Sequence, residues 1–240
     1  MGPWRNRIVT VSITRGPIIM QETNFFHGMT EAEIQRILKN SKNERFFPRG
    51  ATIFREGEET DGIYLITEGL IKVYKMSTDG REKTLAILTP GDILGEMALF
   101  DYSLRSATAE ALQVSSVIVI PRQDFEQLLE EMPVLAIRLI RVLAERLRQA
   151  DEEIKNLLFL NARSRIILHL VQLAEQHIQG HKNGTPIPFR LTHAEMANLV
   201  GVSRETVTRA LSELQDEGLI RIEKRKLWIN DIQKLRDELM

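Results

Sequence analysis

The sequence predicts an α+β protein with an N-terminal β barrel, a long helix and a smaller C-terminal domain of helices and a hairpin. Three observations predict this fold class. Short β-rich runs separated by glycines fill residues 44–121, a continuous helical pattern fills residues 133–163, and two capped helical segments with two further β-rich runs fill residues 192–229. The 240 residues, 43% of them hydrophobic, can bury two modest cores, and typical domain sizes favour two domains.

The N-terminal domain is placed at residues 23–131, after an N-terminal extension of residues 1–22 that we expect to be poorly ordered. Its strands are predicted at 45–47, 51–54, 62–67, 70–76, 84–88, 106–111 and 114–120. Glycines between these runs suit tight turns because glycine tolerates positive φ. Many short strands at this spacing favour a jelly-roll barrel or a sandwich, although any antiparallel β domain fits the pattern.

The long helix is placed at residues 132–161. Heptad positions recur along it in alternating steps of four and three residues, at Leu143, Leu147, Ala150, Ile154, Leu157 and Asn161. This heptad spacing indicates a coiled coil with a second chain, and the run is close to the shortest that does so. The alternative is a helix that packs only on its own domain. We predict a homodimer.

The C-terminal domain is placed at residues 162–240. An amphipathic helix over 163–179 is followed by a loop at 181–188, which is rich in Gly, Asn and Pro. After the two capped helices, β-rich runs at 219–222 and 227–229 predict a hairpin, and a last helix is expected from about Asp231.

Composition excludes several classes of protein. The chain has no cysteine, which rules out disulfides and thiolate metal sites. It has no apolar run of the roughly 18 residues that a membrane span needs and no signal-peptide block, so we expect a cytoplasmic protein. His177 and His181 lack a carboxylate cluster, which favours surface histidines over a metal site. The sequence contains no recognisable nucleophile–base constellation that would indicate an enzyme.

A helix-turn-helix is predicted in the C-terminal domain. Thr192 and Glu195 have the spacing of a capping box at the start of one helix, Gly201 suits the turn, and Ser203 caps a second helix. The formal net charge is −1, so any contact with nucleic acid must be local and cannot depend on a broad basic surface.

The second helix carries residue types that read DNA bases. Its apolar positions fall on one face, and the other face presents Arg204, Glu205, Thr208 and Arg209. Arginine pairs with guanine and a carboxylate accepts from cytosine, so this face indicates a recognition helix. A solvated charged face on two packed helices is the alternative. The expected hairpin, with a basic tip at residues 223–226, would add a wing that contacts phosphates.

Residues 191–209 resemble the helix-turn-helix of the cAMP receptor protein/FNR (Crp/Fnr) family, and the similarity extends over residues 25–229. The cAMP receptor branch has Arg, Glu and Arg at the positions of Arg204, Glu205 and Arg209. This resemblance implies a transcription regulator that binds palindromic double-stranded DNA with TGTGA-like half-sites. It further implies phosphate contacts from Thr192, Ser203 and Thr206, and RNA polymerase contacts through loops such as 76–82 and 181–188.

Within the barrel, Gly95, Glu96 and Met97, followed by Arg105 and Ser106, resemble the phosphate-binding cassette of cyclic-nucleotide-binding domains. The resemblance implies a jelly-roll barrel of the cyclic-nucleotide-binding type. Backbone N–H groups from Gly95 onward and the Arg105 guanidinium suit a cyclic phosphate, with the Ser106 hydroxyl beside it. Glu96 can accept from the ribose 2′-hydroxyl.

The long helix leaves the identity of the effector open. The bacterial cAMP receptor has a Thr-Ser pair that contacts adenine where this chain has Ala150 and Asp151, whereas Arg146 matches the family residue that pairs with Glu96. The Asp151 carboxylate suits the amino group of cAMP or the N1 and N2 donors of cGMP. The alternatives are a family regulator with a different effector or none, and a nucleotide sensor whose winged domain binds proteins.

Overall fold

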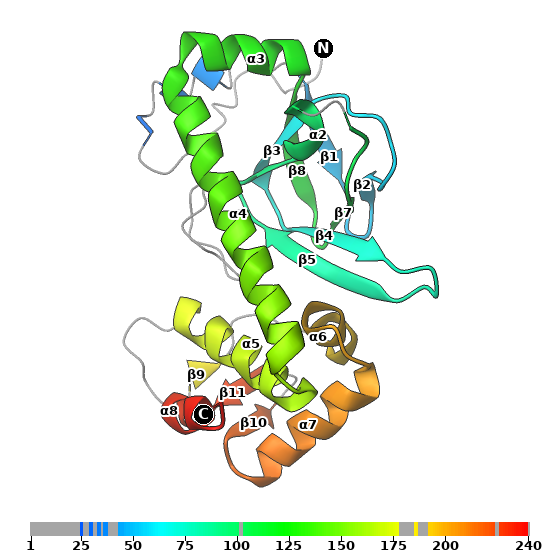
Figure 1. Ribbon diagram of the computed structural model, residues 1–240, viewed down its shortest axis with the longest axis vertical. Helices are drawn as coiled ribbons and strands as arrows, with labels where there is room; N and C mark the ends of the chain where they lie inside the picture. The colour runs from blue at the N-terminus through cyan, green and yellow to red at the C-terminus, as the bar shows by residue number, and fades with distance from the viewer. Residues whose placement is uncertain are drawn as a thin grey trace, which may run out of the picture.

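The computed structural model describes residues 25, 29–30, 33–34, 36–37, 43–100, 103–177, 185–186, 192–223 and 226–239. A β unit lies at one end and a helical unit at the other, and the long helix α4 joins them (Figure 1). The expected N-terminal extension, residues 1–22, lies outside the described residues.

The β unit is formed by two four-stranded antiparallel sheets, and this arrangement confirms the jelly-roll prediction. One sheet has the order β1-β8-β3-β6 and the other β2-β7-β4-β5. Their bounds are β1 (Glu44–Phe47), β8 (Ser115–Ile120), β3 (Ile63–Glu68), β6 (Ile93–Leu94), β2 (Thr52–Phe54), β7 (Thr108–Ala111), β4 (Ile71–Met76) and β5 (Glu82–Leu88). The two-residue strand β6 was not predicted.

Strand β3 is buried on both faces, which explains why its sequence is continuously apolar. Alternate side chains of a strand point to opposite faces. Tyr64 and Ile66 therefore pack between the two sheets. Ile63 and Leu65 point the other way, onto helix α3 (Arg122–Glu131) and the first half of α4. Helix α3 was not predicted from the sequence, and its Phe125 and Leu128 close this side of the barrel.

Helix α4 (Pro133–Phe159) has buried apolar positions in its first half and an exposed apolar row along much of its length. Leu135, Leu139 and Val142 are buried against the barrel. A second row of apolar side chains, the apolar seam, is exposed on the helix, at Ile140, Leu143, Leu147, Ile154 and Leu157. The helix ends at Phe159, before the predicted end at residue 161. Asn161 is therefore not the last seam position: its side chain accepts the backbone N–H of Ser164 at 2.9 Å, at the start of α5.

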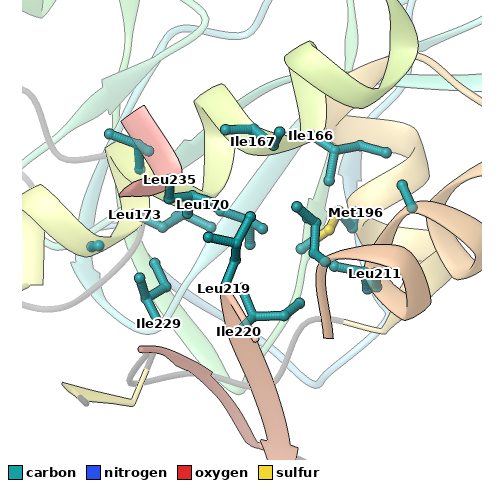
Figure 2. Packing of buried hydrophobic residues seen from close by; sticks show 14 of the residues in the cluster. Ile166, Ile167, Leu170, Leu173, Met196, Leu211, Leu219, Ile220, Ile229 and Leu235 are labelled. Atoms are coloured by element: carbon teal, nitrogen blue, oxygen red, sulfur yellow. The ribbon is translucent and has the colours of Figure 1, made fainter. Parts of the chain in front are cut away.

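The C-terminal unit contains α5 (Ala162–His177), α6 (His193–Val200), α7 (Arg204–Asp216), α8 (Ile232–Asp237) and the antiparallel sheet β10-β11-β9. Ile166, Leu170, Met196 and Leu211 meet in its core (Figure 2). The predicted hairpin is confirmed as β10 (Ile220–Glu223) and β11 (Lys226–Ile229).

The predicted loop at 181–188 is wrong at two positions, since β9 (Thr185–Pro186) pairs with β11. Residues 181–184 and 187–188, including His181, lie outside the described residues, and so does the side chain of His177. Across the part of the chain that the structure describes, no helix is both long and apolar enough to cross a membrane. The same residues contain no group of three or more potential metal ligands among His, Asp and Glu.

Candidate functional site

Helix α6 begins with the predicted capping box. The Thr192 hydroxyl accepts the Glu195 backbone N–H at 3.1 Å, and the Glu195 carboxylate accepts the Thr192 backbone N–H at 2.7 Å. Gly201 ends the helix with φ +74°, a left-handed conformation that glycine adopts at low cost. These local contacts fix the angle at which the chain enters the turn.

Helix α7 begins at the predicted N-cap, where the Ser203 hydroxyl accepts the Thr206 backbone N–H at 3.1 Å. Val207, Ala210, Leu211 and Leu214 are buried in the domain core. Since these residues face inward, the opposite face of α7 is turned to solvent. The helix is thus anchored along one side and accessible along the other.

The solvent face of α7 carries the predicted base-reading residues. Arg204, Glu205, Thr208 and Arg209 are exposed, as are Thr192 and Ser203, whereas Thr206 is half-buried. Hydrogen bonds from its own backbone N–H and from Ser203, together with the charge of Arg204, lower the pKa of Glu205. An ionised Glu205 between two arginines leaves both donors and an acceptor available on one surface.

Thr208 is held in place by its neighbours. Its hydroxyl donates to the Arg204 carbonyl at 2.9 Å and lies 2.8 Å from Nδ1 of His193 on α6. In the hairpin, the Arg221 guanidinium lies 4.6 Å from the centre of the Trp228 ring. The tip residues Lys224 and Arg225 lie outside the described residues, so the predicted basic tip stays a prediction.

The second candidate site is the cassette that follows β6. Gly95 has φ +84°, and a Cβ at this position would lie 2.0 Å from Nη1 of Arg105. Glycine is therefore required here on two grounds: the left-handed backbone and the close approach of the guanidinium. Helix α2 (Met97–Phe100) follows directly.

Arg105 is buried, with 1% of its side chain exposed. Its Nη2 donates to Asp61 Oδ1 and to the Gly62 carbonyl, both at 2.9 Å, and its Nη1 donates to the Gly95 carbonyl at 3.1 Å. The guanidinium also stacks on Phe54, at 4.3 Å from the ring centre. These contacts fix its orientation, yet Nε is buried without a hydrogen-bond partner.

Glu96 is buried with 2% of its side chain exposed and forms an ion pair with Arg146 of α4. Arg146 also donates to the Ile93 carbonyl at 2.6 Å, so α4 is bonded both to β6 and to the cassette that follows it. The second carboxylate oxygen of Glu96, Oε2, is buried without a partner. A buried unpaired carboxylate oxygen costs free energy, which makes it a suitable acceptor for a ligand hydroxyl.

Of the remaining predicted effector residues, two lie at the cassette and two lie on α4. Met97 and Ser106 are exposed at the cassette and contact each other, with 3.7 Å between Ser106 Oγ and Met97 Sδ. Ala150 and Asp151 lie about one turn after Arg146 on α4 and are exposed. The structure therefore brings Gly95, Arg105, Glu96 and Arg146 together, and leaves Ala150 and Asp151 exposed on the surface of the chain.

A cyclic nucleotide-binding domain model matches residues 44–132, and a Crp-like helix-turn-helix domain model matches residues 164–238. The chain is 36% identical over 203 residues to the cyclic AMP receptor protein of Thermus thermophilus, covering 85% of this chain and 90% of that protein. The chain belongs to the Crp/Fnr family of transcription regulators. The helix-turn-helix is the DNA-binding element of regulators in this family. The family is non-enzymatic, which agrees with the prediction from the sequence.

Other members of the Crp/Fnr family are similar over most of their length. The CRP-like cAMP-activated global transcriptional regulator of Mycobacterium tuberculosis is 33% identical over 217 residues, covering 90% of this chain and 96% of that protein. The c-di-GMP responsive global regulator CLP of Xanthomonas campestris superimposes with a TM-score of 0.72 at 26% identity, covering 83% of this chain and 99% of that one.

Asp61 is a residue of the site that the sequence analysis missed. It lies 44 positions before Arg105, accepts from Tyr64 at 2.7 Å and forms an ion pair with Arg45 at 3.1 Å. Its hydrogen bond from Tyr64 and the charges of Arg105 and Arg45 outweigh its burial and lower the pKa of Asp61. The Asp-Gly step at the start of β3 was the available signal, since it places a carboxylate at a turn.

Proposed function

We propose that this Crp/Fnr regulator is a homodimer whose binding to palindromic DNA is controlled by a cyclic nucleotide, most simply cAMP. The observation that carries this proposal is the pair of buried polar atoms without partners in the cassette, Glu96 Oε2 and Arg105 Nε. One is an acceptor and the other a cationic donor. A ligand with a hydroxyl and an anionic oxygen supplies the complement of both.

A cyclic nucleotide fits these groups atom by atom. Its ribose 2′-hydroxyl donates to Glu96, its phosphate accepts from Arg105 and from backbone N–H groups after Gly95, and Ser106 adds a hydroxyl. Met97 belongs to the same cassette and flanks Ser106. The relatives named as cAMP receptor and cAMP-activated regulator support cAMP as this ligand.

The base would be recognised from α4. Ala150 offers no hydrogen bond, so Asp151 is the group available to accept from the adenine amino group. Because the same carboxylate suits the N1 and N2 donors of guanine, cGMP is the competing nucleotide. Both residues are exposed in one chain, and a paired α4 from a second chain would enclose them.

The dimer is proposed from the exposed apolar seam of α4. Leu147, Ile154 and Leu157 are 64%, 56% and 45% exposed, and burying such a row against its copy removes apolar surface from water. Two copies would present two α7 helices to successive major grooves. In this arrangement Arg204, Glu205 and Arg209 read TGTGA-like half-sites, Thr208 lies beside them, and Thr192, Ser203 and Thr206 contact phosphates.

RNA polymerase is the further partner that we propose, through the loops at 76–82 and 181–188.

The experiment that decides the effector is isothermal titration calorimetry, in which cAMP, 2′-deoxy-cAMP and cGMP are each titrated into wild-type protein and into the Glu96→Gln variant. Wild-type protein should bind cAMP more tightly than 2′-deoxy-cAMP by roughly tenfold or more, and Glu96→Gln should reduce this preference because a neutral amide oxygen is a weaker acceptor than a carboxylate. Absence of heat with either nucleotide would rule out the cyclic nucleotide proposal.

A second effector has specific support. Asp61 already pairs with the cassette arginine, and the Xanthomonas relative is described as responsive to c-di-GMP. The same titration with c-di-GMP separates the two. Binding of c-di-GMP that Glu96→Gln leaves unchanged would assign the effector to a cyclic dinucleotide bound elsewhere.

A further inference from the structure

Lys83 lies at the junction of strand β5, helix α4 and helix α6, where the barrel meets the C-terminal unit. Its ammonium group is 2.5 Å from a carboxylate oxygen of Glu153 on α4 and donates to the Leu199 carbonyl in the last turn of α6. Both Lys83 and Glu153 are half-buried, with 28% and 31% of their side chains exposed. A cation at the C-terminal carbonyls of a helix is also favoured by the helix dipole.

Further contacts between the barrel and α6 surround Lys83. Asn198 of α6 donates to Glu82 of β5 at 2.9 Å, and Glu82 is itself paired with Lys72 of β4 at 2.9 Å. Leu199 packs into a small apolar cluster with Leu70 and Ile87 of the barrel. Helix α6, the first helix of the helix-turn-helix, thus docks on the β4–β5 hairpin of its own chain (Figure 1).

Helix α4 connects this junction with the cassette. Arg146 holds Glu96 of the cassette, and Glu153 holds Lys83. Seven residues separate Arg146 from Glu153, which is two helical turns or about 10 Å along one face. The cassette and the DNA-binding unit are therefore attached to the same side of the same helix.

We propose that Lys83 is an interdomain clamp that holds the helix-turn-helix in the orientation used for DNA binding. With the clamp closed, Arg204 and Arg209 remain exposed on α7, and Leu147 remains exposed on the α4 seam. The docked arrangement thus leaves both the DNA-reading face and the dimer seam accessible. Without the clamp, the unit gains orientational freedom that DNA binding must remove again.

The clamp itself can be tested without nucleotide or DNA. The chain has no cysteine, so cysteines introduced by Thr78→Cys and Gln215→Cys are the sole attachment sites for spin labels. Thr78 lies in the turn between β4 and β5 and Gln215 lies on α7, and both are exposed. Labelled chains diluted with unlabelled protein report the distance within one subunit. The wild-type background should give one narrow distance distribution, and Lys83→Met or Glu153→Gln should broaden it. A distribution as narrow in both variants would overturn the clamp.

Its role in DNA binding rests on the proposed function and has a separate readout. Fluorescence anisotropy with a TGTGA palindrome at saturating cAMP should show roughly tenfold weaker binding by Lys83→Met, the size of an ordinary coupling free energy. Lys75→Met is the matched control, since Lys75 pairs with Glu56 away from α6. Unchanged DNA affinity in a variant with a broadened distance would overturn this role. If wild-type protein bound no DNA, the proposed function would fail while the distance measurement still decided the clamp.

Discussion

Asp61 and Arg105 form an ion pair of 2.9 Å although they lie 44 residues apart, and the guanidinium side of the pair is almost fully buried. The carboxylate therefore orients the guanidinium that we propose as the phosphate-binding cation of the cassette. It also takes up part of that cation's charge. Asp61 acts through Arg105 as a positioning residue.

We expect Asp61→Asn to weaken cAMP binding about tenfold, because Arg105 loses its charged partner and with it a fixed orientation. A second signal comes from Tyr64. Burial, the hydrogen bond to Asp61 and the charge of Asp61 raise the pKa of Tyr64 to about 12. In the variant this pKa should fall, which ultraviolet titration of the phenol detects. Unchanged cAMP affinity together with a lowered Tyr64 pKa would show that Asp61 has only a structural role.

Gly95→Ala and Gly50→Ala form a matched pair. Both glycines have φ near +80°, so each substitution carries a similar backbone strain of about 1 kcal/mol. A Cβ at Gly50 meets nothing within 4 Å, whereas one at Gly95 would clash with Arg105. We expect Gly95→Ala to abolish cyclic nucleotide binding and Gly50→Ala to preserve it in calorimetry. Equal binding by both variants would contradict the close packing of Arg105.

His169 on α5 should make stability depend on pH. Burial lowers the pKa of His169 to about 4, with Lys83 and Arg165 acting in the same direction and Glu153 opposing them. In the unfolded chain the pKa is about 6.5, so between these values the unfolded state binds more protons. The free energy of unfolding should therefore fall as pH drops from about 6.5 to about 4, by about 2 kcal/mol from this group.

The measurement is urea unfolding at several pH values for wild-type protein and His169→Gln. Other acidic groups contribute to both proteins, so the difference between the two curves isolates the histidine. The curves should be furthest apart in slope between pH 4 and 6.5 and parallel above pH 7. Parallel curves throughout would show that His169 is not buried in its neutral form.

Arg204→Ala and Arg209→Ala should each weaken binding to the preferred DNA site by about 1–3 kcal/mol and relax specificity at the base that the arginine reads. Selection from a random palindromic library before and after each substitution measures this. Ser203→Ala is a useful contrast, because loss of a cap and a phosphate contact should weaken binding to all sequences. Uniform weakening by the arginine variants would refute base reading.

Leu147→Lys should separate the dimer, since Leu147 is central in the α4 seam and 64% exposed in the single chain. Burying an unpaired ammonium group in a seam is strongly unfavourable. Sedimentation should give a dimer for wild-type protein and a monomer for the variant. Arg148→Met, about 100° around the helix from Leu147 and outside the seam, should remain dimeric. A wild-type monomer at micromolar concentration would contradict the dimer.

The parts of the fold that were predictable carry local signals. The capping box at Thr192, the N-cap at Ser203 and the turn glycine Gly201 each act within a few residues, and all three are confirmed. The main barrel strands were equally visible, because glycines mark their ends. Strands β6 and β9 have only two residues each and are defined by their partners, so nothing in their own sequences distinguishes them.

Most residues of the candidate site could be predicted from the sequence, but the hydrogen bonds and ion pairs between them could not. The sequence motif identifies Arg105, but it does not reveal that Asp61 and two backbone carbonyls hold the guanidinium inside the protein. The same limit applies to Lys83, whose partners Glu153 and Leu199 lie 70 and 116 residues away. Contacts of this range depend on how the domains pack.

The seven-residue interval between Arg146 and Glu153 sets the rotational phase of these two side chains on α4 as well as the distance between them. Each residue added to a helix turns everything beyond it by about 100°. A single insertion between these two positions would leave both halves of the helix intact, yet it would turn Glu153 away from Lys83 while Arg146 still faced Glu96. Inserting a whole heptad would return Glu153 to the same face but would carry it about 10 Å further along the helix, so it too would separate Glu153 from Lys83.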